Sequence, residues 1–413
     1  MKNPKTQHLE FGGAYGSIFM ILSLPVTVFG IYTSCNQGGC PAPPMAFDDL
    51  NVYGVLAPFG WFLWQLFLYQ VFPGEIVQGT LLRDGSKRNY KINAWICFKA
   101  TILVAGFMTF VYDLSPWIWI ADQYFSLAVG SSILATVLAI SVYAHSFRSM
   151  DVLLSEMGNS GYMTYDFWMG RELNPTWTDK IDLKYFCELR PGLIGWTILN
   201  LALAAKQYDL YGSLSWSMIL VVLFQGYYVV DALLNERAIL TTMDITTDGF
   251  GFMLAFGDLV WVPFTYSLQA RYLTLFSSDL SNTAIIGIIS LKIIGLFIFR
   301  SANSQKNAFR TDPNQDSVSH LKYMQTESGS KLLISGWWGV ARHINYTGDW
   351  LMGLSWCLPC GFHHPLPYFY AIYFAILLIH RAQRDDEKCR KKYKKDWEKY
   401  CQLVPYQLIP GII

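Results

Sequence analysis

The sequence predicts an all-α, polytopic integral membrane protein with about ten transmembrane helices. Of its 413 residues, 53% are hydrophobic and only 15% are charged, whereas soluble domains carry about 25% charged residues. The apolar residues gather in runs whose lengths are close to the roughly 18–20 residues that a helix needs to cross a hydrocarbon core about 30 Å thick. Lysine and arginine concentrate in alternate connections between these runs, as is typical of membrane proteins.

Ten runs are candidates for membrane crossing, and the fifth, ninth and tenth are the shortest. In chain order they lie near 14–33, 52–72, 93–112, 125–145, 192–206, 212–234, 250–269, 283–300, 349–362 and 365–380. We expect an N-terminal part, 1–191, with helices 1–4 and a cytoplasmic loop, and a C-terminal part, 192–413, with helices 5–10.

The basic residues predict the orientation of these spans. With the N-terminus on the Lys/Arg-rich side, ten crossings place five further basic segments on that same side: 73–92, 146–191, 235–249, 301–348 and 381–413. By contrast, lysine and arginine are missing from 34–51, 113–124 and 361–364. The positive-inside rule therefore predicts that both termini face the cytoplasm.

Charge and motif content argue against several classes of protein. With 31 Lys+Arg against 30 Asp+Glu the net charge is +1, so no basic field is available to attract nucleic acid. A GxGxxG motif after a strand is absent, which excludes a Rossmann nucleotide domain. The histidines lack paired metal-ligand spacing, and Cys357-x-x-Cys360, which has a redox or zinc spacing, has no second pair at ligand distance, so no metal site is predicted. The eight cysteines show no disulfide framework, and we interpret Cys357-x-x-Cys360 as buried packing thiols.

Acidic residues occur where lipid is expected. Asp231 and Glu236 close the sixth run, and Asp244, Asp248 and Asp258 follow within or beside the seventh. Because charges inside a membrane are costly and usually mark a polar cavity, Asp231, Glu236 and Asp244 are candidates for a substrate pocket. The alternative is that each acid caps a helix or pairs with a neighbour such as Arg237.

A second concentration of polar residues lies between Arg300 and Asp349. Lys306 and Arg310 stand four residues apart, and the stretch GWWGVARHINYTGD follows them. Forked donors beside aromatic rings suit a phosphorylated, aromatic ligand. A salt-bridged loop is the alternative. Without a Rossmann domain, a dinucleotide bound here would be held by side chains.

Several long motifs resemble the membrane sterol reductases, a family that includes the delta-14 sterol reductases, the 7-dehydrocholesterol reductases and the reductase half of the lamin B receptor. The resemblance covers nearly the whole chain. It is carried by DFWMGRELNP, the run from Thr241 to Leu273, SANSQKNAFR, LLISGWWGVARHINYTGD and HRAQRDDEKCRKKYKKDWEKYCQLVPYQLIP. The stretch RHINYTGDWLMGLSWCLP looks closest to the fungal-type delta-14 sterol reductases.

The resemblance implies that the C-terminal part holds NADPH on the cytoplasmic side, next to a sterol pocket that opens toward the bilayer. We add Arg342 and Arg381 to the implied cofactor residues on charge grounds. The full set is Lys306, Arg310, Leu333, Trp338, Arg342, Asn345, Tyr346, Arg381, Asp385, Cys389, Arg390, Lys391, Lys392, Tyr393 and Tyr400. Three positions depart from the family pattern, which often has His at Thr247, Gly at Lys394 and Arg at Gln407.

The implied reaction is reduction of the 14,15 double bond of a sterol by protonation followed by hydride transfer. An electron-rich double bond must be protonated first, so the protein must supply a proton donor and exclude water. Tyr228 and Asp385 are the predicted acid relay, and Tyr228 shares a helix face with Asp231. Tyr227, Glu236 and Asp244 remain alternatives for the donor.

Three other functions stay open at this point: a sterol delta-7 reductase of the same family, a non-catalytic sterol-binding membrane protein, and a nuclear-envelope scaffold. The expected partners are a sterol and the lipid bilayer, without nucleic acid. The expected membrane is the endoplasmic reticulum in a eukaryote and the inner membrane in a bacterium. The sequence does not specify the oligomeric state.

Overall fold

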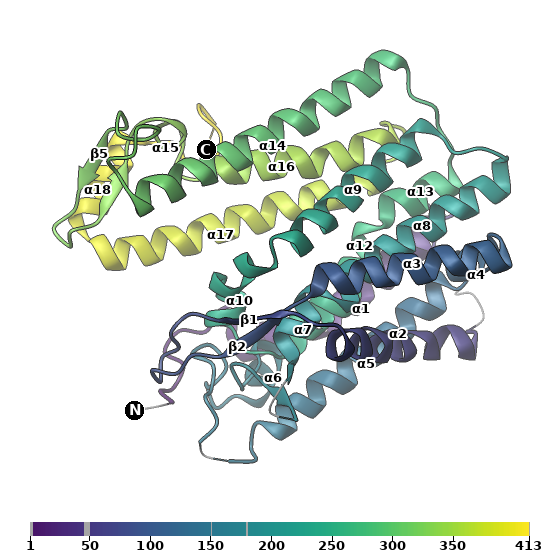
Figure 1. Cartoon of the computed structure of the whole chain (residues 1–413), viewed down its shortest axis with the longest axis horizontal. Helices are drawn as coiled ribbons and strands as arrows, with labels where there is room; N and C mark the ends of the chain where they lie inside the picture. Colours follow the sequence, from purple (N-terminus) through teal and green to yellow (C-terminus); the bar gives the residue numbers. More distant parts are fainter. Residues whose placement is uncertain (1–2, 45–49, 150, 179–180, 413) are drawn as a thin grey trace. The chain divides into compact units, whose positions relative to one another are not determined.

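The computed structural model describes residues 3–44, 50–149, 151–178 and 181–412. The chain folds into two compact units, Met1–Ser277 and Ser278–Ile413, and is mainly helical (Figure 1). In the described residues, strands form only small antiparallel pairs. The predicted division into 1–191 and 192–413 was drawn from the order of the spans and stays a prediction.

The N-terminal unit contains long helices and a series of short ones. The long helices are α1 (Gly13–Ser34), α2 (Val52–Val71), α3 (Ala94–Tyr112), α5 (Tyr124–His145), α8 (Pro191–Tyr211) and α9 (Trp216–Leu234). The shorter ones are α4 (Ser115–Asp122), α6 (Met163–Met169), α7 (Leu183–Leu189), η1 (Glu236–Thr241), α10 (Met243–Thr246), α11 (Phe252–Phe256), η2 (Gly257–Trp261), α12 (Val262–Tyr266) and α13 (Leu268–Leu275). Strand β1 (Glu75–Gln78) pairs with β2 (Asn89–Ile92), and β3 (Thr176–Trp177) pairs with β4 (Ile181–Asp182).

The C-terminal unit is built on three helices: α14 (Asn282–Thr311), α16 (Ile344–Cys357) and α17 (Phe369–Tyr393). Its smaller elements are β5 (Tyr323–Gln325), β6 (Lys331–Leu333), α15 (Trp337–Val340), η3 (Leu358–Cys360), η4 (Leu366–Tyr368) and α18 (Lys395–Leu403). Figure 1 shows β5, α15 and α18 gathered around one end of α14 and α17. Polar loops and the basic ends of two long helices therefore meet in one place.

Within the described residues, six helices are long and apolar enough to cross a membrane: α1, α2, α3, α5, α9 and α14. The predicted count of about ten is not confirmed. The fifth predicted run corresponds to α8, and the ninth and tenth correspond to α16 with η3 and to α17 with η4. The seventh, 250–269, contains α11, the π-helical turn η2 and α12, which follow one another without a gap.

The backbones of α8 and η2 approach each other closely. A β-carbon added to Gly192, in the first turn of α8, would lie 1.9 Å from the carbonyl oxygen of Asp258 in η2. Only glycine permits this contact. The hydropathy of 250–269 predicts a helical run but carries no signal of the π-helical turn or of this tertiary contact.

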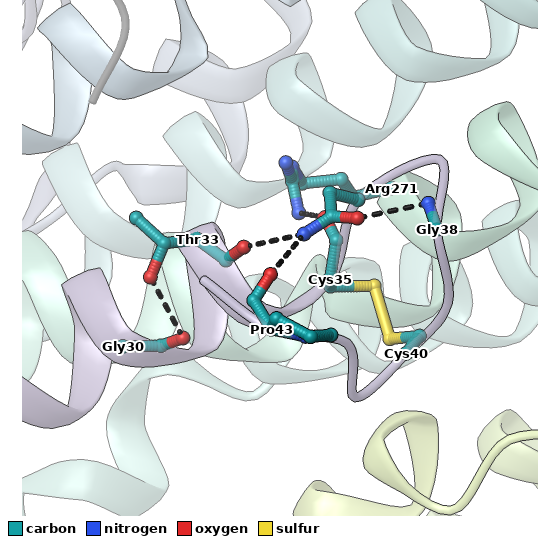
Figure 2. The surroundings of a disulfide bond; sticks show 8 residues. Gly30, Thr33, Cys35, Gly38, Cys40, Pro43 and Arg271 are labelled. Atoms are coloured by element: carbon teal, nitrogen blue, oxygen red, sulfur yellow. Dashed lines mark hydrogen bonds between the residues drawn. A yellow bond between two sulfur atoms is a disulfide. The ribbon is translucent and has the colours of Figure 1, made fainter. Parts of the chain in front are cut away.

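The structure corrects the expectation that the cysteines form no disulfide. Cys35 and Cys40 are bonded to each other in the turn after α1, and both are buried. Figure 2 shows Arg271, from α13, donating from Nη1 to the carbonyl oxygen of Cys35 across 2.7 Å. A tight turn closed by backbone bonds between Asn36 and Gly39 brings the two thiols together, and their spacing alone did not indicate it.

The other cysteines of the described chain are free thiols, and Cys357 and Cys360 are buried. This placement agrees with their interpretation as packing residues. The predicted outer segment 34–51 is described only in part, because 45–49 lie outside the described residues.

Candidate functional site

The C-terminal unit contains a cavity of about 390 Å³ where α14, β6, α15, α16, α17 and α18 meet. Twelve of the fifteen predicted cofactor residues line it, the exceptions being Arg381, Arg390 and Lys391. Arg390 instead pairs with Asp386 at the surface across 3.1 Å. Motifs that lie far apart in the sequence thus contribute residues to one cavity.

The last turns of α14 supply one wall. Lys306 and Arg310 are one turn apart and share a helix face. The Nζ atom of Lys306 lies 3.8 Å from the ring centroid of Trp338, a cation–π contact. Trp338 in turn donates from Nε1 to the carbonyl oxygen of Ala302 across 2.8 Å. The charge of Lys306 therefore lies against the ring of Trp338, and the hydrogen bond to Ala302 holds that ring against α14.

A glycine allows α15 to lie close to α14. Gly336 has φ +63°, and a β-carbon there would lie 2.6 Å from Oε1 of Gln305. That oxygen accepts a hydrogen bond from the backbone nitrogen of Trp337 across 2.9 Å. A larger residue at position 336 would displace the chain that carries Trp338.

Arg342 fastens the C-terminal segment to the beginning of α16. Its Nη1 atom donates to the carbonyl oxygens of Val404, at 2.7 Å, and Pro405, at 2.8 Å. Thr347 donates to the carbonyl of Leu408 across 2.7 Å. The Nε atom of Arg342 is buried and has no hydrogen-bond partner among the described residues. Arg342 thus holds the backbone with one nitrogen and leaves another unused beside the cavity.

Asn345 shows the same pattern. Its Nδ2 atom donates to Asn303 across 3.3 Å, whereas its Oδ1 atom is buried with no partner in the described chain. Unsatisfied buried polar atoms are rare in folded proteins. Two of them belong to residues that line this cavity.

Asp385 projects from α17 and accepts a hydrogen bond from the hydroxyl of Tyr346 across 3.2 Å. The ring of Tyr346 stacks on that of His343, with centroids 5.0 Å apart. Burial lowers the pKa of His343 to about 4, so its imidazole is neutral at pH 7. Burial also raises the pKa of Tyr400 to about 12, so this phenol keeps its proton.

Positive charge dominates the cavity wall. Asp385 is the single carboxylate among the lining residues, which include the cations Lys306, Arg310, Lys331, Arg342, Lys388 and Lys392. Among the described residues, no salt bridge neutralises Lys306, Arg310 or Arg342. This excess of positive charge favours an anionic ligand.

Sequence reasoning missed six lining residues: Phe309, Lys331, Leu332, His343, Lys388 and Trp397. Lys388 could have been found, because it stands three residues after Asp385 and four before Lys392 on one helix. His343 lies inside the motif that supplied Arg342 and Asn345. Lys331 and Trp397 reach the cavity through tertiary folding, which no local pattern indicates.

Tyr228 and Asp231 lie on α9 in the N-terminal unit. Tyr228 is 38% exposed, and its ring centroid is 6.0 Å from that of Trp196. Asp231 accepts from Nδ2 of Asn235 across 3.1 Å. Tyr227 is 44% exposed beside Tyr228. Because Asp385 belongs to the other unit, a relay between Tyr228 and Asp385 stays a prediction.

Glu236 belongs to a buried network. Its Oε1 atom pairs with Nη2 of Arg190 across 2.6 Å and accepts from the hydroxyl of Tyr185, while Oε2 caps the backbone nitrogen of Ala94 at 2.8 Å. These contacts match the alternative in which an acid caps a helix or pairs with a base, although the partner is Arg190. Its expected neighbour Arg237 pairs with Glu75 instead.

Asp244 lies on the short helix α10. Next to this helix, the buried Nζ of Lys184 donates to the carbonyl oxygens of Ile245 and Asp248, at 3.0 and 2.6 Å. Roles for Asp231, Glu236 and Asp244 in a substrate pocket stay predictions.

Comparison with known proteins gives a consistent result. The model of the ergosterol biosynthesis ERG4/ERG24 family matches residues 44–413. A Delta(14)-sterol reductase of Ascobolus immersus is 47% identical, with 98% of each chain covered. Delta(14)-sterol reductase erg24 of Schizosaccharomyces pombe is 46% identical, covering 98% of this chain and 97% of the relative.

Delta(14)-sterol reductase LBR of Gallus gallus is 47% identical over 97% of this chain and 64% of the relative. The resemblance predicted from the motifs is confirmed.

Proposed function

The chain belongs to the ergosterol biosynthesis ERG4/ERG24 family, and on this premise we propose that it reduces the 14,15 double bond of a sterol intermediate with NADPH. The observation that carries the proposal is identity of 46–47%, over nearly the full length of the chain, to proteins named Delta(14)-sterol reductase. The cationic cavity of the C-terminal unit supports the choice of cofactor.

The residues of this cavity fit a phosphorylated dinucleotide. Lys306 and Arg310 would hold phosphate groups, since two cations on one helix face lack acidic partners in the described chain. Trp338, Tyr346 and Tyr400 offer aromatic faces. Arg342 and Asn345, which line the cavity, would supply a further donor and an acceptor. When bound, NADPH would supply a hydride.

Protonation of the sterol is the task of the protein. Tyr228 would deliver a proton to carbon 15, which leaves a tertiary, allylic cation at carbon 14 in a conjugated diene. Asp231, one turn along α9, would place negative charge near that cation. The apolar residues of the surrounding helices would exclude the water that traps such a cation.

Asp385 would act from the cofactor cavity. Its hydrogen bond from Tyr346 fixes the carboxylate, which then orients the nicotinamide or passes on a proton. Tyr227, Glu236 and Asp244 are the alternatives for the donor, and Glu236 is the least accessible of them because it is only 2% exposed.

The proposal includes a membrane topology of ten spans with both termini in the cytoplasm and the NADPH and sterol pockets in 192–413. The Cys35–Cys40 disulfide supports this orientation, because disulfides persist on the oxidising side of a membrane. We place the protein in the endoplasmic reticulum of a eukaryote or the inner membrane of a bacterium.

Incubation of purified protein with NADPH and a panel of unsaturated sterols tests the function. Gas chromatography with mass spectrometry should show loss of 14,15-unsaturated dienes only. Reduction of an isolated 7,8 double bond would instead identify a delta-7 reductase. Sterol binding without turnover, and without thermal stabilisation by NADPH, would identify a sterol-binding protein and refute the proposal.

A further inference from the structure

The N-terminal unit contains a second cavity, of about 340 Å³, enclosed by α2, α4, α5, α8 and the chain from η2 to α12. Its volume lies within the range of about 300–1,000 Å³ that is typical of small-molecule sites. Among the described residues that line it, none carries a charge. None of the residues predicted to bind cofactor or substrate lines it either.

Aromatic side chains form much of the wall of this cavity, and a hydrogen bond holds one of them in place. Trp61 on α2 donates from Nε1 to the carbonyl oxygen of Pro191 across 2.9 Å, so its polar atom is already paired. A β-carbon on Gly195 would lie 3.3 Å from that same nitrogen, so the glycine lets the indole lie against α8. Trp64, Trp119 and Phe264 add further aromatic surface.

One hydroxyl group interrupts this apolar lining. Ser131 on α5 is 7% exposed, and its hydroxyl makes no hydrogen bond within the described chain. The adjacent Ser132 shows the usual alternative, since it donates to the carbonyl of Ala128 across 2.8 Å. Leu127 and Leu134 line the cavity one turn to either side of Ser131. A hydroxyl that lines an otherwise apolar cavity, with no hydrogen-bond partner in the described chain, favours a ligand with a polar group of its own.

We propose that this cavity binds a sterol, with the sterol hydroxyl paired to Ser131. An acyl chain of a phospholipid would fill the apolar volume but would leave the serine unpaired, whereas a sterol carries one hydroxyl on a rigid apolar body. Access would be from the hydrocarbon, because Gly60 on the candidate span α2 is exposed and Trp119 is 39% exposed. The proposal rests on the proposed function only for the choice of sterol.

A cavity-filling variant tests the site. Gly60 lines the cavity, and a β-carbon there would meet nothing within 4 Å, so Gly60→Leu adds side-chain volume at the cavity edge without a backbone clash. Replacing a helical glycine by leucine also favours the helix. Gly106→Leu is the matched control, because Gly106 is an exposed glycine on α3 with equally open space around it.

Binding of tritiated cholesterol to the protein in nanodiscs, without NADPH, provides the measurement. Gly60→Leu should weaken binding by at least tenfold, and Gly106→Leu should not change it. Ser131→Ala should weaken cholesterol binding by roughly 2- to 13-fold, which corresponds to the loss of one ordinary hydrogen bond. The same variant should leave binding of tritiated cholestene, which lacks the hydroxyl, unchanged. Equal binding of cholesterol by wild type and Gly60→Leu would overturn the proposal.

A photoreactive cholesterol analogue gives a result that needs no variant. Adducts should map to peptides of α2, α4, α5 and α8, and excess phosphatidylcholine should not remove them. Adducts confined to other segments, or removed by phosphatidylcholine as readily as by cholesterol, would contradict the site. Sterol reduction is assayed separately, so binding without turnover refutes only the proposed function, and turnover without binding here refutes only this site.

Discussion

The hydroxyl of Tyr346 on α16 donates a hydrogen bond to Oδ2 of Asp385 on α17 across 3.2 Å, inside the cationic cavity of the C-terminal unit. The two residues come from motifs 39 positions apart in the chain. The ring of His343 stacks on that of Tyr346, with centroids 5.0 Å apart, and burial lowers the pKa of His343 to about 4, so its imidazole is neutral at pH 7. Asp385 is therefore an oriented carboxylate among cations.

Asp385→Asn should lower turnover by at least about 100-fold, the usual scale for loss of a proton-transfer group. NADPH affinity should not weaken, because the change removes a negative charge from a phosphate-binding cavity. Steady-state kinetics and titration of NADPH measure both effects. Asp386→Asn is the control, since Asp386 bonds Trp397 and Arg390 and lies outside the lining. Normal turnover together with weakened NADPH binding in Asp385→Asn would show that Asp385 is not part of the proton relay.

Lys306→Gln and Arg310→Gln should each weaken NADPH binding by about 10- to 150-fold, which corresponds to roughly 1.5–3 kcal/mol for a charge-assisted contact. Lys322→Gln, an exposed lysine outside the cavity, should leave affinity unchanged. Calorimetric titration at two salt concentrations gives the comparison. Unchanged affinity in both cavity variants would move the cofactor site elsewhere.

Arg342→Ala should behave differently from the two variants above. Its Nη1 atom holds the carbonyls of Val404 and Pro405, so the substitution should lower the melting temperature as well as weaken NADPH by 10-fold or more, on the order of one charge-assisted contact. Thermal melts without cofactor separate the effects. A melting temperature equal to that of wild type would show that the C-terminal segment does not depend on Arg342.

The pH dependence of stability should carry a contribution from His343. Its folded pKa, about 4, lies below the ordinary value of 6.5, so the unfolded chain takes up a proton first as the pH falls. Stability is therefore lost between pH 6.5 and 4, by roughly 2–4 kcal/mol. His343→Gln should flatten this loss, whereas His320→Gln, at an exposed position, should not. An identical pH profile in wild type and His343→Gln would contradict the assignment.

Lys394→Gly should stabilise the C-terminal unit. Lys394 has φ +51° between α17 and α18, a conformation that costs a side-chain-bearing residue about 1–2 kcal/mol. Glycine avoids this cost because it has no β-carbon. Lys395→Gly, at the first residue of α18, should instead lower the free energy of unfolding, by at most about 1 kcal/mol. Chemical denaturation compares the two, and a lower stability for Lys394→Gly would refute the prediction.

The proposed topology predicts opposite labelling of two introduced cysteines. Gln7→Cys lies in the N-terminal segment, and Ser213→Cys lies in the exposed connection between α8 and α9. In sealed vesicles with the cytoplasmic side inward, a membrane-impermeant maleimide should reach Ser213→Cys alone. Equal labelling of the two, above the wild-type background, would end the ten-span arrangement.

Local pattern was sufficient for much of the fold. The predicted runs 14–33 and 93–112 agree closely with α1 and α3, because apolar length and helical period are properties of neighbouring residues. The run 250–269 is helical from Phe252 to Tyr266, but its π-helical turn η2, against which Gly192 of α8 lies, was not predicted. Such a contact between distant segments leaves no trace in hydropathy.

The candidate site likewise combines residues that local spacing predicted with residues that only tertiary folding brings together. Lys306 and Arg310 were paired correctly from their spacing on one helix, and both line the cavity. The bond of Glu236 to Arg190, 46 residues away, and the entry of Trp397 into the cavity depend on tertiary folding. The positions of Tyr228 and Asp385 relative to each other remain a prediction for the same reason.

Isotope transfer tests the proposed reaction most directly. Wild-type protein should be incubated with a 14,15-unsaturated diene sterol and NADPH deuterated at the transferred position, and the product examined by nuclear magnetic resonance. Protonation followed by hydride transfer predicts deuterium at carbon 14, and solvent deuterium at carbon 15 when the reaction runs in heavy water. Label from the cofactor at carbon 7 or carbon 15, or a product without label, would contradict it.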